Sequence, residues 1–162
     1  MTLSIGDRLP SATFLEVGPD GPQSVPSVEI FKGRKIALFA VPGAYTGTCS
    51  TQHVPSFIRV ADQLREKGVD EIVCVSVNDP FVMKAWSEAT GAGAAGIRML
   101  GDPSSAFTRA VGLDFDREAA GLIGRSKRYS ALVEDGVVKV LNLEASPGDC
   151  EISAGETLLA AV

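Results

Sequence analysis

The 162-residue sequence lacks the hallmarks of several large protein classes. No apolar run approaches the ~20 residues that a membrane-spanning helix requires. The opening MTLSIGDRLP has no charged segment followed by an apolar one, so we expect no secretory signal. Fifteen basic residues against 20 acidic ones give a net charge of −5. The one basic cluster, RSKR at 125–128, is interpreted as a solvated loop. We therefore expect no membrane and no nucleic acid among its partners.

Cysteine and histidine are also scarce. Three cysteines, an odd number, do not resemble a disulfide framework, which favours a reducing compartment, and we expect the cytoplasm. In such a compartment a cysteine is more often buried, metal-binding or reactive than bridged. The single histidine and the scattered cysteines show no metal-ligand spacing such as C-x-x-C, so we expect no metal and no cofactor.

Strand-like and helix-like segments alternate along the chain. No repeat, low-complexity tract or linker interrupts them, which predicts one domain over residues 1–162. The first 34 residues are rich in Gly, Pro and Ser and predict short strands and turns. Apolar runs predict buried strands, and Asp135-Gly136 predicts a hairpin turn. The expected strands are 35–41, 72–77 and 97–100, then YSALVE and VVKVLNLE on either side of that turn.

Helices are expected after each of the first three strands and at the end of the chain. Val54, Phe57 and Leu64 lie at helical spacing, and Pro55 should kink that helix. The other helices are expected to open at Asp79-Pro80, at Asp102-Pro103 and after a capping box at Ser153–Glu156. This order predicts an α/β fold with parallel crossovers and an antiparallel hairpin at one side, as in a thioredoxin-like sheet with insertions.

Cys49 lies in the segment VPGAYTGTCS (41–50), between a predicted buried strand and a predicted helix. The carboxyl ends of strands are where α/β proteins place their chemistry. Free N–H groups and the positive end of a helix dipole there stabilise a thiolate, which is the reactive form of cysteine. Thr46 and Thr48 bring hydroxyl groups within reach of the sulfur. Position alone also allows a half-buried small residue with no chemical role.

Pro42, Thr46 and Cys49 form a P-x-x-x-T-x-x-C array, and VPGAYTGTCSTQHVPSF resembles the active-site segment of the peroxiredoxins. The pattern is similar to the type II, or fifth-type, subfamily. The resemblance continues in VSVNDPFVMKAW, GDPSSAF, KRYSALVEDG and CEISAGETLL and so covers nearly the whole chain. Tyr45 replaces the usual Phe, which is a mild change. Gly47 replaces a common Pro and so removes a rigid residue, which predicts a more mobile loop.

The resemblance implies a thioredoxin-like fold with peroxiredoxin insertions and a thiol-dependent peroxidase. Cys49 would be the peroxidatic cysteine, which reduces hydrogen peroxide or alkyl hydroperoxides and becomes a sulfenic acid. Thr46 would align the peroxide, Pro42 would exclude water, and Arg128 of the K-R-Y-S step would bind the peroxide oxygens. Thioredoxin, glutaredoxin or glutathione would restore the thiol, in the service of cell redox homeostasis. The resemblance also implies a homodimer.

The other candidate residues leave alternatives open. His53 is interpreted as a hydrogen-bonded pocket residue rather than a general base for Cys49. Cys74, in the middle of an apolar strand, is interpreted as an inert thiol, although plant-like relatives have a second cysteine at this position. Cys150 follows a Pro-Gly step and is either a resolving cysteine, as in animal fifth-type proteins, or a bystander.

Three other functions are alternatives to a peroxidase. A disulfide reductase needs a second cysteine near the first, but position 52 is Gln. A cysteine hydrolase needs an Asp or Asn to orient His53. A non-catalytic interaction module leaves the array of Pro42, Thr46 and Cys49 without explanation. Trp86, Phe107 and the tyrosines are interpreted as core or subunit-contact residues.

Overall fold

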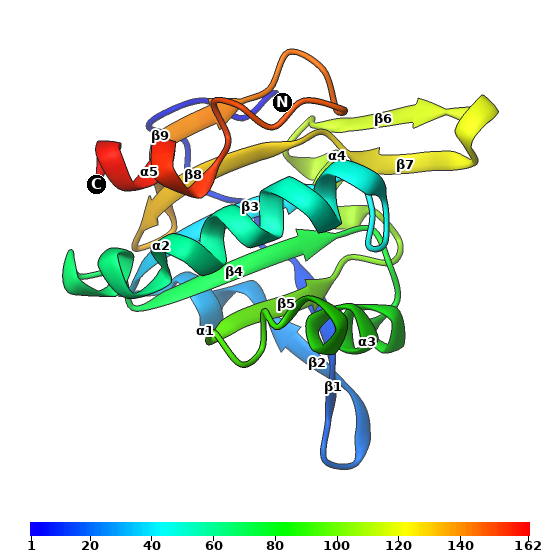
Figure 1. Ribbon diagram of the computed structural model, residues 1–162, viewed down its shortest axis with the longest axis horizontal. Helices are drawn as coiled ribbons and strands as arrows, with labels where there is room; N and C mark the ends of the chain where they lie inside the picture. The colour runs from blue at the N-terminus through cyan, green and yellow to red at the C-terminus, as the bar shows by residue number, and fades with distance from the viewer.

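A seven-stranded mixed sheet forms the centre of the computed structural model, which describes residues 1–162 (Figure 1). The strand order is β2-β1-β5-β4-β3-β8-β9, with β3, β4 and β5 parallel and β8 antiparallel to β3. This is the thioredoxin-like α/β arrangement that the order of segments predicted. The strands are β1 (Thr13–Gly18), β2 (Gly21–Pro26), β3 (Lys35–Val41), β4 (Glu71–Ser76), β5 (Ile97–Gly101), β8 (Tyr129–Glu134) and β9 (Val137–Leu143).

Helices cover both faces of the sheet, so each face has its own apolar core. Residues of α1 and α4 contribute to one core, and residues of α2, α3 and α5 contribute to the other. No helix is both long and apolar enough to span a bilayer. The helices are α1 (Ser27–Phe31), α2 (Val54–Glu66), α3 (Pro80–Thr90), α4 (Ala106–Ala110) and α5 (Gly155–Ala161), with a π-helical turn at Cys49–His53 and a 3-10 turn at Glu118–Ala120.

The clearest local signals in the sequence are confirmed. Every residue of β3 after Lys35 is buried, as its continuous apolar run predicted. Asp79 begins α3 by accepting a hydrogen bond from the Val82 amide, and Gly91 ends that helix in the left-handed conformation. Asp135 and Gly136 both have positive φ values, as a two-residue hairpin turn between β8 and β9 requires.

Two helix starts differ from the prediction. The helix expected from Asp102 begins only at Ala106, because the Asp102 carboxylate accepts bonds from Phe107 and Thr108 across an intervening turn. The predicted capping box before α5 is wrong, since Ser153 donates to Glu144 instead of capping the helix.

Two further elements add to the sequence-based expectation. Pro55 lies inside a continuous helical run that begins before Cys49 and includes the π-helical turn at Cys49–His53, so the kink expected at Pro55 stays a prediction. In the first 34 residues, short α1 appears where only strands and turns were expected.

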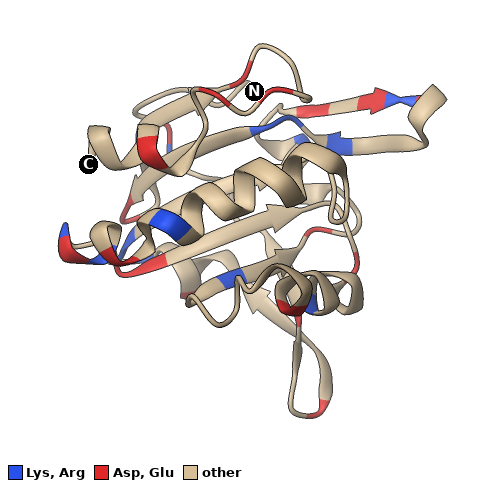
Figure 2. Ribbon diagram, viewed as in Figure 1, with Lys and Arg blue, Asp and Glu red and all other residues tan.

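A second sheet, which the sequence analysis did not predict, lies beside the first. It is a hairpin of β6 (Asp114–Arg117) and β7 (Leu122–Ser126) that extends from one side of the molecule in Figure 1. The interpretation of residues 125–128 as a solvated loop is therefore wrong. Arg125 belongs to β7, and Arg128 is only 2% exposed. Figure 2 shows charged residues of both signs on this hairpin.

Candidate active site

Cys49 is the first residue of the π-helical turn that connects the loop after β3 to α2. Its side chain is fully buried and packs in the core between the sheet and α2. The next residue, Ser50, accepts a hydrogen bond of 3.0 Å from the indole of Trp86 on α3. The cysteine is therefore fixed beyond the carboxyl end of β3, in a site shielded from bulk water.

Two side chains contact the sulfur of Cys49. Arg128 Nη2 donates to it at 3.0 Å, and Thr46 Oγ1 lies 2.8 Å from it. Thr46 Oγ1 is also 2.7 Å from the Gly43 carbonyl oxygen. Because a hydroxyl has one proton, it can donate to the carbonyl while the oxygen faces a thiol, or donate to a thiolate. Thr48, expected near the sulfur, instead donates to the Gly148 carbonyl.

The Arg128 guanidinium donates hydrogen bonds from all three of its nitrogens. Beside the bond to Cys49, its Nε donates to the Pro147 carbonyl and its Nη1 donates to His53 Nδ1, each at 3.0 Å. A buried charge with so many partners has little freedom to turn. Arg128 thus presents a fixed positive charge to the sulfur.

His53 supports Arg128 and is not available as a base for Cys49. Its Nε2 lies 3.0 Å from the Ser153 carbonyl, which can only accept, so this nitrogen carries the proton and Nδ1 accepts from Arg128. Burial and the positive charge of Arg128 lower the pKa of His53 from 6.5 to about 3. The geometry therefore agrees with a hydrogen-bonded pocket histidine and disfavours a Cys–His hydrolase.

Pro42 is buried beside the sulfur site and has a partner that the sequence analysis overlooked. Arg125 Nη1 donates to the Pro42 carbonyl at 3.1 Å. A Cβ atom on Gly43 would lie 2.4 Å from that same nitrogen, so a side chain there would displace the Arg125 guanidinium from this bond. The only sequence signal for Arg125 is its place in the basic cluster at 125–128.

Glu144 is a second residue that the sequence analysis missed. Its Oε2 accepts from the amides of Glu151 and Ser153 and from the Ser153 hydroxyl. These bonds fix the segment 145–153, whose Pro147 and Ser153 carbonyls hold Arg128 and His53. The role of Glu144 could not be predicted from the sequence, because two of its three partners are backbone amides and all lie in a separate segment of the chain.

The remaining two cysteines are free thiols. Cys74 is buried in β4, and burial, together with nearby Cys49, raises its pKa well above the ordinary value. Cys150 is half-buried in the segment 145–153, and burial raises the pKa of its thiol too. Both thiols are consequently weaker nucleophiles at neutral pH than an exposed cysteine.

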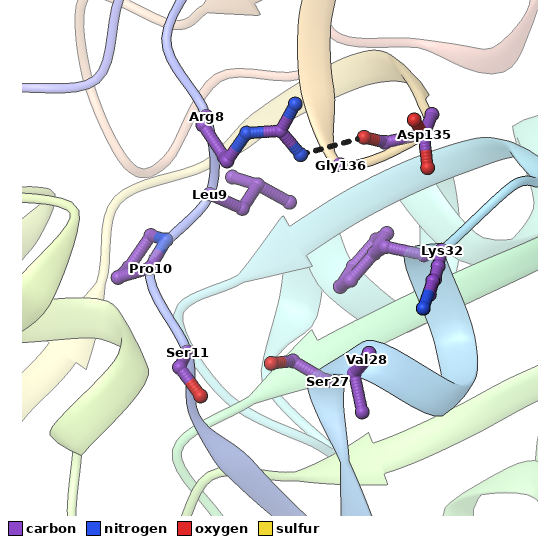
Figure 3. Close-up of a pocket in the computed structure, with 10 residues that line it drawn as sticks. Arg8, Leu9, Pro10, Ser11, Ser27, Val28, Lys32, Asp135 and Gly136 are labelled. Carbon is purple, nitrogen blue, oxygen red and sulfur yellow. Dashed lines mark hydrogen bonds between the residues drawn. The ribbon is translucent and has the colours of Figure 1, made fainter.

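A cavity of about 210 Å³ opens beside the Cys49 site. Pro42, Thr46 and Arg128 form one side of it, and residues of the β6–β7 hairpin form another. A larger cavity of about 480 Å³ lies near the other end of β3, between α1 and the β8–β9 turn, and contains no cysteine (Figure 3). There Arg8 donates to the Asp135 carbonyl. The smaller cavity is the one that can bring a small molecule near Cys49. No three His, Cys, Asp or Glu side chains gather as a metal-binding group.

A buried cysteine at the carboxyl end of a thioredoxin-like strand, bonded to an arginine and a threonine, defines a thiol-based redox enzyme. The Redoxin family model matches residues 4–159 of the chain. The chain therefore belongs to the redoxin family, and its relatives identify it as a peroxiredoxin, a thiol-dependent peroxidase that acts through a peroxidatic cysteine.

Those relatives come from plants and bacteria. Chloroplastic peroxiredoxin-2E-2 of Oryza sativa subsp. japonica is 50% identical, with 98% of this chain and 72% of that protein covered. Peroxiredoxin-2B of Arabidopsis thaliana is 41% identical over 99% of this chain and 98% of its own length. The crystal structure of reduced Prx3 in complex with H2O2 from Vibrio vulnificus has 49% identity and a TM-score of 0.91, and 99% of each chain is covered.

Proposed function

We propose that Cys49 is the peroxidatic cysteine and that it reduces hydrogen peroxide and alkyl hydroperoxides. The observation that carries this proposal is the pair of bonds on its sulfur, from Arg128 and Thr46. The thiolate attacks the terminal oxygen of the peroxide, an S–O bond forms and the O–O bond breaks. The products are a sulfenic acid on Cys49 and an alkoxide or hydroxide, which takes up a proton to become alcohol or water.

Arg128, Thr46 and Pro42 each have a distinct role in this step. Arg128 stabilises the thiolate and the negative charge that develops on the departing oxygen. Thr46 holds the peroxide in line with the sulfur, because its hydroxyl lies at hydrogen-bonding distance from Sγ. Pro42 is buried beside the site and keeps water away from the thiolate. The H2O2 in the Vibrio vulnificus Prx3 crystal supports hydrogen peroxide as one substrate.

The assignment is tested by peroxide consumption with a dithiol reductant. Cys49→Ser keeps the shape of the side chain but loses the nucleophilic sulfur, so the first oxidation step should stop while the fold remains. Cys74→Ser is the matched control, since it replaces a buried thiol of the same core. Appreciable turnover by folded Cys49→Ser protein would contradict the assignment.

Reduction of the sulfenic acid requires a thiol from outside or from Cys150. We propose that thioredoxin, glutaredoxin or glutathione performs it and that Cys150 is a bystander. The bonds from Arg128 to Pro147 and from Thr48 to Gly148 favour this, because they fix the segment that carries Cys150. Turnover with each reductant separately, in wild type and Cys150→Ser, tests the proposal.

We further propose a homodimer that works in the cytoplasm to maintain redox homeostasis. Tyr45 and Phe81 support the dimer, since they are 57% and 60% exposed. They belong to neighbouring segments, because the Ala44 amide donates to Asn78. Three free cysteines suit a reducing compartment. Sedimentation of wild type and Phe81→Ser protein tests the dimer, which the substitution should weaken.

A further inference from the structure

The inner face of the β6–β7 hairpin forms a wall of the cavity beside Cys49. Phe115, Arg117 and Leu122 line this cavity together with Pro42, Thr46 and Arg128 of the sulfur site. The register explains this placement, because Arg117 lies directly opposite Leu122 in the antiparallel pair, and partners in such a pair share a face. Two apolar side chains, Phe115 and Leu122, and the cation Arg117 therefore line the same side of the cavity.

The Arg117 guanidinium in this wall has no hydrogen-bond or ion-pair partner, unlike the two other arginines near the site. Arg128 is bound to Cys49, His53 and Pro147, and Arg125 is bound to the Pro42 carbonyl. Arg117 takes no part in the ion pairs or side-chain hydrogen bonds of the chain, and its guanidinium carbon lies 6.0 Å from the centre of the Phe115 ring. Its charge is free to pair with a ligand.

We propose that this wall selects organic hydroperoxides whose apolar part ends in a carboxylate. Phe115 and Leu122 contact the apolar part, and Arg117 pairs with the carboxylate while the peroxide group reaches Cys49. The inference rests on the proposed function, because the wall matters only if peroxides react at Cys49. An arginine fork suits a planar carboxylate, which two parallel N–H groups can bind.

The chemical step is the same for such a substrate as for hydrogen peroxide. The Cys49 thiolate takes the terminal oxygen of the hydroperoxide, the O–O bond breaks, and the alkoxide is protonated to an alcohol that keeps its carboxylate. The thiol gives up two electrons and the hydroperoxide accepts them, so no further reactant is needed for this half of the cycle. Because Arg117 is exposed, its pairing should raise the rate with the charged substrate by up to about fivefold.

Two probes of nearly equal shape isolate the effect of the carboxylate. They are cumene hydroperoxide and its para-carboxylate, with hydrogen peroxide as a reference that does not fill the cavity. The second-order rate of Cys49 oxidation is measured for each by rapid quenching and mass spectrometry. The readout is the ratio of the carboxylate rate to the neutral cumyl rate, in wild type, Arg117→Met, Arg117→Glu and Lys127→Met. Lys127→Met removes the same charge nearby, from a residue outside the cavity lining.

Wild type and Lys127→Met should prefer the carboxylate, Arg117→Met should lose the preference, and Arg117→Glu should reverse it. The wild-type preference should also shrink as salt is added, because the pair is exposed. An equal ratio in wild type and Arg117→Met would overturn the inference. If wild type oxidises Cys49 with none of the three peroxides, the proposed function itself fails, and this outcome is distinct from a lost preference.

Discussion

Arg128 and Cys49 are 79 residues apart in the chain, yet Arg128 Nη2 donates to the Cys49 sulfur at 3.0 Å. Cys49 lies in the turn that follows β3, and Arg128 is the residue just before β8. The two strands are neighbours in the sheet, with Ala40 paired to Tyr129, so their ends meet. The pairing of β3 with β8 is therefore what creates the sulfur site.

Arg128→Met should slow oxidation of Cys49 by hydrogen peroxide by roughly 10²–10³-fold, the usual loss when one donor to a developing oxyanion is removed. Methionine has a similar length but neither charge nor donors. Rapid-quench measurement of sulfenic acid formation checks the rate. Lys127→Met serves as the control, since its side chain is not bonded to the sulfur site, and the two variants behaving alike would mean that the effect is only diffuse charge.

Arg125→Met should slow oxidation of Cys49 less than Arg128→Met does, but more than Lys127→Met does. Arg125 does not touch the sulfur but donates to the Pro42 carbonyl in the loop that holds Thr46. Loss of one such bond should misplace the loop rather than remove charge from the reaction. Arg125→Lys, which keeps a donor, should recover part of the rate, whereas a rate equal to that of Arg128→Met would show that Arg125 acts on the peroxide directly.

Thr46→Val should slow peroxide reduction by roughly ten- to hundredfold, because the bond of its hydroxyl to a charged partner is lost while the branched shape remains. Thr46→Ser keeps the hydroxyl and should retain most of the rate. Steady-state peroxide consumption over a range of concentrations measures both. Equal activity of the valine and serine variants would show that the Thr46 hydroxyl takes no part in peroxide reduction.

The single histidine gives the protein a defined response to acid. The unfolded chain binds a proton at His53 near pH 6.5, but the folded chain binds it only near pH 3. Between these values the unfolded state holds more protons, so the free energy of unfolding falls as the pH decreases. From about pH 7 to about pH 5 the loss should be about 2 kcal/mol.

Urea unfolding at the two pH values measures this loss. His53→Gln should retain the acceptor for Arg128 and the donor for Ser153 but cannot titrate, so its stability should depend less on pH by that amount. The imidazole signals of the one histidine in the nuclear magnetic resonance spectrum report its pKa directly. An ordinary pKa in the folded protein would contradict the proposed bonding of His53.

Much of the sheet could be predicted because its signals are local. The run KIALFAV becomes buried β3, and Asp135-Gly136 forms the expected turn. The β6–β7 hairpin was missed because its strands are short: β6 is mostly exposed and charged, and β7 shows no apolar alternation. The capping box failed for a different reason: Ser153 has a better partner in Glu144, which is distant in sequence.

The residues of the candidate site likewise differ in whether local sequence signals reveal them. Pro42, Thr46 and Cys49 lie within eight positions, so their pattern in the sequence is visible. Arg128 could be chosen only through a family resemblance, because three basic residues stand close together and nothing local distinguishes the buried one. The support from Arg125, Glu144 and the Ser153 carbonyl depends on tertiary contacts, which periodicity cannot reveal.

The fate of the sulfenic acid distinguishes a one-cysteine from a two-cysteine enzyme. A Cys49–Cys150 disulfide requires Cα atoms within about 7 Å and side chains directed toward each other. Cys49 is fully buried, and the segment with Cys150 is fixed by Glu144 and by the bond from Arg128 to Pro147. We therefore expect one equivalent of peroxide to leave a sulfenic acid that persists until an external thiol arrives.

Trapping with dimedone, followed by mass spectrometry of peptides, measures the sulfenic acid and any disulfide in the same sample. Wild type and Cys150→Ser should give equal dimedone adducts at Cys49. Glu144→Gln weakens the bonds that hold the segment and should increase the fraction of Cys49–Cys150 disulfide, because the two sulfurs can then meet. A dominant Cys49–Cys150 disulfide in wild type, with loss of thioredoxin-dependent turnover in Cys150→Ser, would instead make Cys150 the resolving cysteine.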